Sequence, residues 1–488
     1  MRYSSTNVDK NVDFPNQEGL NQTKFIDNSS SVDKQESMNY SKTLNLPQFF
    51  KAINPSKCLI TGEREEGQYH INYSSALGSQ TIESFKQTIA LISPNQPTCQ
   101  LLTGHIGCGK STELRRLKAE LEDEGFHVVY LESSQYLDMA YIDITDILLS
   151  IAGKVSESLA EIQIKVKSDY FTHLFRDIVD LWQIPISLDT EGSFAIEKIT
   201  ANTKNSPKLW RELRKYLEPR TMGILDSINQ EILEIAIAKL KRRGKAGLVV
   251  IVDNLDRVDN HILPFGRSLP EYLFIDRGDT LRKLNCHVVY TIPLSLMFSN
   301  EVEILKNRLG GGLPPKILPM IPVRQRNGAV SQEGMALLRQ IVMVRAFPHL
   351  TPMERLELIT EVFDTPETLD RLCLISGGHV RNLLGILYGC VRQEDPPISR
   401  QVLEKVIRES RNYMTSSLDD DEWTLLFKVI QKQTVRGDWE YSTLLRGMFV
   451  HEYQDRNGSW FDINPVLKET EKYQSWLKQQ EKLRQATN

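Results

Sequence analysis

Short runs of consecutive hydrophobic residues recur along the middle of the chain. They lie at 99–103, 126–131, 248–252, 287–292 and 316–323. Runs of this length that are rich in Val, Ile and Leu predict buried strands of a parallel sheet. Residues 111–124 repeat leucine at helical spacing and are followed by Gly125, which predicts a helix between the first two strands. The order strand, glycine-rich loop, helix, strand predicts an α/β fold with a parallel sheet.

Further amphipathic segments surround these strands. Residues 81–92 have helical spacing and lead into the first strand. More than a hundred residues separate the second strand from the third, and 141–161 and 209–243 within them also have helical spacing. The pattern therefore predicts an α/β domain over 46–325 that carries a helical insertion at about 137–245.

Helical patterns replace the strands after Pro322. They lie at 332–347, 353–362, 366–375, 380–392 and 400–414, and predict an all-α lid domain over 326–417. Two more helices, 422–433 and 441–449, precede alternating segments on either side of Asn457-Gly458, the strongest short signal for a hairpin. Helices followed by a hairpin are typical of a winged helix, so 418–488 is predicted to form such a domain and a terminal charged helix at 473–484.

Composition narrows the class of protein. Residues 1–45 are rich in Asn, Ser, Asp and Gln, which predicts a disordered tail. The net charge of −4 gives no reason to expect nucleic acid or membrane as the main partner. No hydrophobic stretch is long enough to span a bilayer, and the six cysteines are dispersed without a C-x-x-C pair. These features predict a cytoplasmic protein with reduced thiols.

The loop after the first strand carries the clearest chemical motif. Residues 104–111 read G-H-I-G-C-G-K-S and fit G-x-x-x-x-G-K-[ST] in full. Backbone amides of such a loop face phosphates, Lys110 reaches the β and γ phosphates, and Ser111 ligates magnesium. We therefore expect ATP and Mg²⁺ as cofactors, held by Gly104, His105, Ile106, Gly107, Cys108, Gly109, Lys110, Ser111 and Thr112.

A phosphate-binding loop needs an acidic residue at the end of another strand to hold the metal ion. Asp253 ends the 248–252 run and is predicted to ligate magnesium together with Ser111. Asp256 and Arg257 follow in the sequence D-N-L-D-R, where a surface ion pair is the alternative interpretation.

These motifs resemble the AAA-type and STAND branch of P-loop ATPases, in particular the KAP and origin-recognition-like groups with D-x-x-D-R. The resemblance covers roughly residues 55–465. In most AAA-type enzymes a glutamate directly follows the metal-binding aspartate and polarises the attacking water. Asn254 occupies that position here, so the resemblance implies ATP binding more directly than hydrolysis, and Asp256 would have to serve as the base.

The resemblance also implies residues that sense the γ-phosphate. Thr291 matches the polar residue at the tip of the next strand, and Arg308 is the candidate for an arginine that completes a neighbour's site. Arg381, in the segment S-G-G-H-V-R-N, matches the sensor 2 arginine on the lid. The alternative for each is an ordinary strand threonine or a surface arginine.

Three functions remain open at this stage. The first is an ATP-driven conformational switch, with slow ATP hydrolysis, that acts on an unknown protein client. The second is an ATP-dependent loader or regulator that binds DNA, although the predicted recognition helix carries only one cation, Arg446. The third is a STAND-type signalling protein that assembles as a homo-oligomer, and phosphoryl transfer to a small acceptor is a further competitor.

Overall fold

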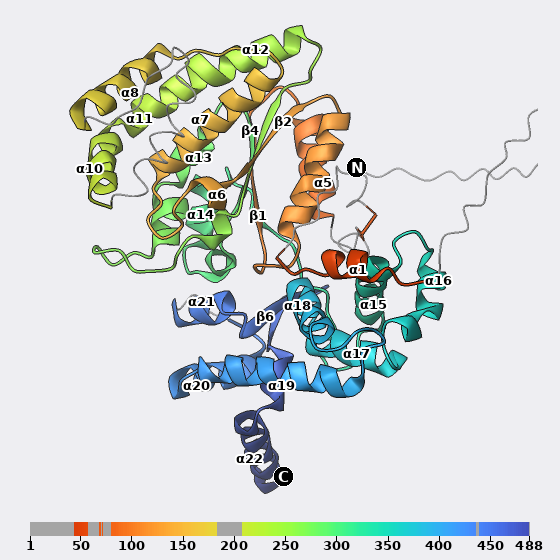
Figure 1. Cartoon of the computed structure of the whole chain (residues 1–488). Coiled ribbons are helices and arrows are strands. Elements are labelled where there is room, and N and C mark those ends of the chain that lie inside the picture. Colours follow the sequence, from red (N-terminus) through yellow and green to blue (C-terminus); the bar gives the residue numbers. More distant parts are fainter. Residues whose placement is uncertain are drawn as a thin grey trace, which may run out of the picture. The chain divides into compact units, whose positions relative to one another are not determined.

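A five-stranded parallel sheet forms the first part of the fold (Figure 1). The computed structural model describes residues 43–56, 68–69, 71, 80–182, 207–435 and 439–487. The strand order is β2-β3-β4-β1-β5, and every neighbouring pair is parallel. The strands are β1 (Cys99–Thr103), β2 (His127–Glu132), β3 (Leu248–Asp253), β4 (His287–Thr291) and β5 (Lys316–Ile317). The predicted α/β class with a parallel sheet is confirmed.

Alternate residues of the strands pack into two separate cores, as the two-residue period of a strand requires. Val128, Val249 and Ile251 belong to one core with the helices that flank the phosphate-binding loop. Val129, Val250 and Val252 belong to the other core, with the helices of the insertion. The sheet is covered on both faces, which explains why its strands read as continuous hydrophobic runs.

Helices from two parts of the chain cover these faces (Figure 1). One layer contains α4 (Thr81–Gln87), the π-helix η1 (Thr88–Ile92) and α5 (Lys110–Asp123). The other contains α7 (Ile144–Glu161), α8 (Asp169–Trp182), α10 (Pro207–Leu217), α11 (Thr221–Ser227), the π-helix η3 (Ile228–Leu233) and α12 (Glu234–Arg242). Shorter elements connect them: α6 (Ser133–Tyr136), η2 (Glu218–Arg220), η4 (Leu255–Arg257), η5 (Glu271–Asp276), α13 (Gly278–Arg282), η6 (Leu294–Phe298) and α14 (Val302–Arg308).

Two predicted elements are shorter in the structure than expected, in both cases at a proline. The strand predicted over 316–323 pairs only at Lys316 and Ile317, because Pro319 and Pro322 cannot donate hydrogen bonds to a sheet. The helix predicted over 209–243 is interrupted at Pro219, where the 3₁₀ turn η2 separates α10 from α11. Helix α8 was not predicted at all.

In the helical region after the sheet, a side chain just before each main helix accepts a hydrogen bond from a main-chain amide of the first turn. This region contains α15 (Gln332–Ala346), α16 (Pro352–Glu357), η7 (Ile359–Glu361), α17 (Pro366–Ile375), α18 (Val380–Val391) and α19 (Arg400–Ser416). The capping residues are Ser331, Thr351, Thr365, His379 and Ser399. An unpredicted N-terminal helix, α1 (Leu46–Ala52), packs Phe49 and Ile53 into the same core.

The C-terminal elements confirm the predicted order of two helices and a hairpin. Helix α20 (Asp420–Lys432) and α21 (Trp439–Arg446) precede β6 (Val450–Asp455) and β7 (Gly458–Ile463), which pair antiparallel. The segment ends with η8 (Pro465–Glu469) and α22 (Glu471–Thr487). Helix α21 ends three residues earlier than the predicted 449, since Gly447 and the left-handed Met448 (φ +60°) follow it.

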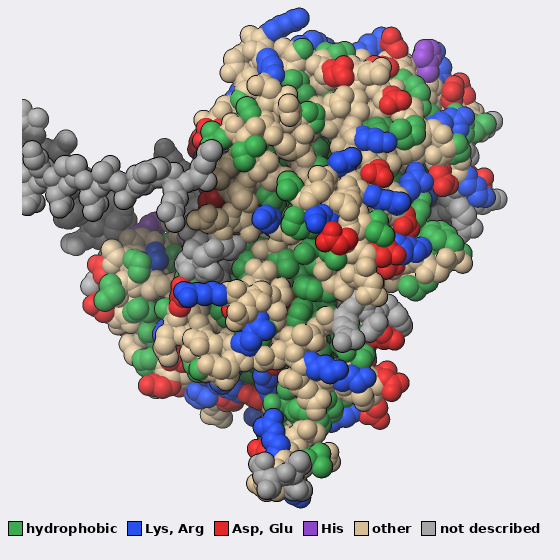
Figure 2. All heavy atoms as spheres, turned by 180° about the vertical axis from the view of Figure 1, so that it is seen from behind, with side chains coloured by type: hydrophobic (Ala, Val, Ile, Leu, Met, Phe, Trp, Pro, Cys, Tyr) green, Lys and Arg blue, Asp and Glu red, His purple; other side chains and the backbone are tan. Residues whose placement is uncertain are grey.

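Some predictions fall on parts of the chain without a described structure. Residues 1–42 of the predicted disordered tail and 183–206 of the predicted insertion lie outside the described residues. Among the helices that are described, none is long and apolar enough to cross a membrane. Charged side chains of both signs are interspersed over much of the face seen in Figure 2.

Candidate functional site

The phosphate-binding loop lies between the end of β1 and the start of α5, as its motif requires. Gly104, Gly107 and Gly109 have φ angles of +147°, +92° and +106°, which side-chain-bearing residues rarely adopt. Lys110 and Ser111 follow in the first turn of α5, so the helix N-terminus adds its partial positive charge to the loop. The loop therefore has the backbone form of a phosphate cradle.

Lys110 is buried and bonded within the loop. Its ammonium donates to the carbonyl oxygens of Gly104 and His105 at 2.7 and 2.8 Å, and lies 3.0 Å from Oδ2 of Asp256. Burial lowers the pKa of Lys110 and is the largest single effect, but the charge and hydrogen bond of Asp256, together with Cys108 and Asp253, outweigh it, so the pKa is raised. Lys110 thus stays charged in a position from which it can turn to a phosphate.

Two aspartates follow β3 and differ in their surroundings. Asp253 is buried, and its carboxylate accepts the hydroxyl of Tyr130 at 2.7 Å and the amide of Asn254 at 2.7 Å. Asp256 lines the pocket in front of the loop, and its Oδ1 is buried without a hydrogen-bond partner. The carboxylate that meets Lys110 is therefore Asp256.

A magnesium ion with bound phosphates suits part of this donor set. Ser111 lines the pocket, and the partnerless Oδ1 of Asp256 is an oxygen that could face a cation or a water. The side chain of Asp253, the predicted ligand, is not among the residues that line the pocket and is bonded to Tyr130. A rotation of Tyr130 would be needed before Asp253 could face the metal ion.

Asn254 replaces the usual glutamate and has its own local role. Its backbone is left-handed, with φ +66°, which asparagine tolerates better than most residues. Its amide nitrogen donates to Oε1 of Glu132 and, at 3.3 Å, to the hydroxyl of Ser134. The side-chain amide of Asn254 therefore ties the end of β3 to the end of β2 and to α6, and it offers no base for a water molecule.

Thr291 and Arg308 lie away from the pocket. Thr291 is fully buried, and its hydroxyl accepts the amide of Leu255 at 3.0 Å, which fixes the start of η4. The guanidinium of Arg308 donates to the carbonyls of Ile275 and Asp276. Thr291 therefore positions the Asp256 turn in this structure, and Arg308 does not reach this chain's own loop.

The start of α18 lies directly against the phosphate-binding loop. The amide of Arg381 donates to the carbonyl of Gly107 at 3.3 Å, and Nε2 of His379 is 2.8 Å from the carbonyl of Ile106. A Cβ atom at Gly107 would meet both Arg381 and His379 at 2.9 Å. Glycine is thus required at this position by the contact with the start of α18 as well as by its φ angle.

A pocket of about 600 Å³ opens between the loop and the start of α18. It unites most of the predicted residues, including Lys110, Ser111, Asp256 and Arg381. It also contains residues that the sequence did not single out as pocket lining: Pro55, Arg257, Arg345 and Val380. Lys110, Arg257 and Arg381 give the pocket an excess of positive charge, which suits a triphosphate.

The hairpin also touches the phosphate-binding loop. The amide of Glu452 donates to Nε2 of His105 at 2.8 Å, and the hydroxyl of Tyr453 donates to the carbonyl of Gly377 at 2.7 Å. The rings of His105 and His379 both lie near His451, with centroids 5.9 and 6.3 Å away. Burial raises the pKa of Glu452 to about 7. No sequence signal pointed to His105, His451 and Glu452 as an interface.

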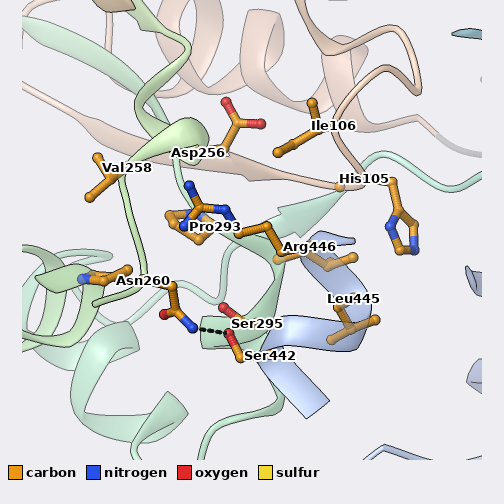
Figure 3. Close-up of a pocket in the computed structure, with 13 residues that line it drawn as sticks. His105, Ile106, Asp256, Val258, Asn260, Pro293, Ser295, Ser442, Leu445 and Arg446 are labelled. Carbon is orange, nitrogen blue, oxygen red and sulfur yellow. Dashed lines mark hydrogen bonds between the residues drawn. The ribbon is translucent and has the colours of Figure 1, made fainter. Parts of the chain in front are cut away.

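Helix α21 forms one wall of a second pocket of about 420 Å³ beside the loop (Figure 3). Ser442 accepts a hydrogen bond from Asn260, and Arg446 lies 3.2 Å from Oδ1 of Asp259. Arg446, the only cation of the predicted recognition helix, is therefore paired with the carboxyl-side loop of β3.

Strand β1, the glycine loop, α5 and the acidic end of β3 together define a P-loop NTPase domain. Residues 79–263 match the model of the KAP family P-loop domain. No curated protein matches the sequence.

Several solved structures align with most of this chain at low sequence identity. The ORC2 protein of Aeropyrum pernix, solved in ADPNP–ADP complexes, is 12% identical, with a TM-score of 0.39 over 86% of this chain and 94% of that chain. A chain of Drosophila ORC bound to DNA is 11% identical, with a TM-score of 0.38 over 90% and 95%. Cdc6p of Pyrobaculum aerophilum is 13% identical, with a TM-score of 0.38 over 85% and 94%.

Proposed function

We propose that this protein binds ATP at the loop 104–111 and acts as a nucleotide-driven conformational switch. One observation carries the proposal: the lid and the hairpin both form hydrogen bonds to the loop itself, at Gly107, Ile106 and His105. A phosphate that enters the loop changes the charge and the backbone environment at these contacts. A change of the bound nucleotide would therefore alter the contacts of two segments that are distant in sequence, the start of α18 and the hairpin.

The residues of the pocket have distinct roles in this proposal. Lys110 would leave the carbonyls of Gly104 and His105 and turn to the β and γ phosphates. Arg381 would meet the γ-phosphate and hold the lid closed, and Arg257 would add a second positive charge at the mouth of the pocket. Mg²⁺ would neutralise phosphate charge when bound through Ser111 and, once Tyr130 has rotated away from it, Asp253.

Slow ATP hydrolysis is part of the proposal. Asn254 has no basic group, whereas Asp256 has a buried carboxylate oxygen without a donor and lines the pocket. Asp256 would orient and deprotonate a water molecule, and Thr291 would hold its turn through the amide of Leu255. Arg308 would contribute only in trans, from a second copy in a homo-oligomer.

The client of the switch is proposed to be a protein. The alternative, a DNA loader, requires cations that are free to reach a phosphate backbone. Arg446 is the one cation of α21, and it is paired with Asp259. The predicted recognition helix therefore gives the DNA alternative little support.

ATP binding and turnover of Lys110→Ala test this proposal against wild type. We expect binding to weaken by at least about a hundredfold, because the variant loses a charge-assisted contact to phosphate in a buried site. Lys118→Ala is the matched control, since Lys118 lies on the same helix with its side chain 34% exposed and pairs with Glu122. Absence of ATP binding by wild type, or equal binding by the Lys110 variant, would overturn the proposal.

A further inference from the structure

A compact group of cations lies at the C-terminal end of α12. We call it the basic end, and it consists of Lys239, Lys241, Arg242, Arg243 and Lys245. The last four are exposed, and Lys239 is half-buried. Figure 2 shows Lys and Arg side chains at the top of the molecule, the end at which α12 lies in Figure 1. The chain as a whole is slightly acidic, so this charge is local.

The cations of the basic end are not held in ion pairs within the described part of the chain. No described Asp or Glu forms an ion pair with any of its five residues, and Arg243 and Lys239 instead donate to main-chain carbonyls. Helix α5 offers a contrast, because each of its cations is paired. The pairs are Lys110–Asp256, Arg115–Glu132, Arg116–Glu113 and Lys118–Glu122. Glu124, which ends that segment, pairs with Lys86.

Two histidines lie close to this charge: the half-buried His127 at the start of β2 and the buried His287 at the start of β4. Burial lowers the pKa of His127, and Lys245 makes the largest charge contribution in the same direction, ahead of the opposing effect of Glu122. Burial also lowers the pKa of His287, with a further contribution from Lys241. The basic end therefore contributes positive charge at this end of the sheet, opposed at His127 by Glu122 and Glu161.

Two exposed aliphatic side chains lie next to the basic end. Leu91 and Ile92, at the end of η1, are 73% and 74% exposed. The chain then turns, with the amide of Gln96 bonded to the carbonyl of Ser93, and Asn95 in this turn accepts a hydrogen bond from Lys241 at 2.9 Å. Solvated aliphatic residues beside unpaired cations are the two chemical features that an anionic lipid surface binds.

We propose that the basic end, together with Leu91 and Ile92, docks the protein on an anionic membrane surface. The cations attract acidic headgroups, and the two aliphatic side chains enter the boundary between headgroups and acyl chains. A nucleic-acid backbone would use the charge but would leave both aliphatic side chains in water.

The position of this surface leaves the nucleotide pocket accessible. Lys245 precedes β3, and the phosphate-binding loop follows the C-terminal end of β1, while all strands of the sheet run parallel. Strands of six residues separate the two ends by roughly 20 Å. A bilayer at the basic end would therefore lie opposite the pocket, and docking would not require the proposed switch function.

Vesicle co-sedimentation of the full chain tests the proposal. We expect binding to vesicles with 30% phosphatidylserine and none to pure phosphatidylcholine, with loss at high salt. The variant with Lys241→Gln, Arg242→Gln and Lys245→Gln should bind about a hundredfold more weakly, at roughly fivefold per cation. The variant with Leu91→Ser and Ile92→Ser, which keeps every charge, should bind at least about tenfold more weakly.

A matched triple variant, Lys405→Gln, Lys428→Gln and Lys478→Gln, removes the same charge from exposed sites on other helices and should bind vesicles like wild type. Thermal melting and ATP binding check that every variant is folded. Equal binding by the two triple variants would overturn the proposal. So would wild-type binding to duplex DNA that depends on the basic end but not on Leu91 and Ile92, with no binding to the acidic vesicles.

Discussion

Nε2 of His105 accepts the main-chain amide of Glu452 at 2.8 Å, and this bond joins the phosphate-binding loop to strand β6. Burial, with the nearby His451, His379 and Lys110, lowers the pKa of His105 well below its ordinary value, so the ring is a neutral acceptor. A side chain inside the glycine loop thus serves as a contact for the C-terminal hairpin.

His105→Ala should loosen that hairpin. The variant leaves the Glu452 amide buried without an acceptor, which costs about 1–3 kcal/mol of the free energy of unfolding. Hydrogen exchange should show faster exchange of the Glu452 amide, and urea denaturation should show the loss of stability. His261→Ala, at a partly exposed histidine, is the control. Unchanged protection at Glu452 would mean that the bond contributes nothing.

The buried pair of Lys110 and Asp256 predicts a double-mutant result in the nucleotide-free protein. Lys110→Met leaves a buried carboxylate without its partner and should destabilise the fold by about 3–5 kcal/mol. Adding Asp256→Leu should restore much of that loss, since the uncompensated charge is then gone. Chemical denaturation of the four proteins measures the coupling, and simple additivity of the two substitutions would contradict it.

Gly107 and Gly125 form a natural pair for testing the contact between the loop and the lid. Both have φ near +90°, but a Cβ atom at Gly107 meets Arg381 and His379 at 2.9 Å, whereas one at Gly125 meets nothing within 4 Å. Alanine at either site should cost about 1 kcal/mol through backbone strain. Gly107→Ala should cost about 1–3 kcal/mol more and weaken ATP binding, because the start of α18 must move. Comparison of unfolding midpoints and ATP affinities separates the two effects, and equal behaviour of the variants would rule out a tight lid contact.

Local sequence patterns predicted those parts of the fold that depend on local physics. The strands β1 to β4 are hydrophobic runs because both of their faces are buried, and the hairpin follows from Asn457-Gly458. The predicted length of β5 was wrong, because the prediction rested on its hydrophobic residues, whereas Pro319 and Pro322 limit the pairing of the strand. The pairing of residues far apart in sequence had no local signal.

The candidate site shows the same division. Lys110, Ser111 and Arg381 were predicted from motifs, and the structure brings them to one pocket. The contact of His105 with Glu452 joins positions 347 residues apart, and no periodicity or motif encodes such a pair. Tyr130, which donates a hydrogen bond to Asp253, was likewise predicted only as part of a strand, because the two residues are 123 positions apart in the sequence.

Glu452 predicts an unusual dependence of stability on pH. Its pKa of about 7 in the folded protein lies above its ordinary value of 4.5, so the folded state binds this proton more tightly than the unfolded state. The stabilisation is fully present below pH 4.5 and is lost as pH rises through 7, and it amounts to about 3 kcal/mol. His379 and His451, whose pKa values burial lowers to about 4 and 3, act in the opposite sense and lose stability below pH 6.5. The histidine contribution is the same in wild type and in Glu452→Gln, so it cancels in the difference between their free energies of unfolding.

Urea denaturation from pH 5 to 8 tests this prediction. Wild type should lose stability relative to Glu452→Gln as the pH rises, whereas Glu357→Gln, at an exposed position, should follow wild type throughout. Parallel curves for wild type and Glu452→Gln would show that the carboxyl of Glu452 does not titrate in this range.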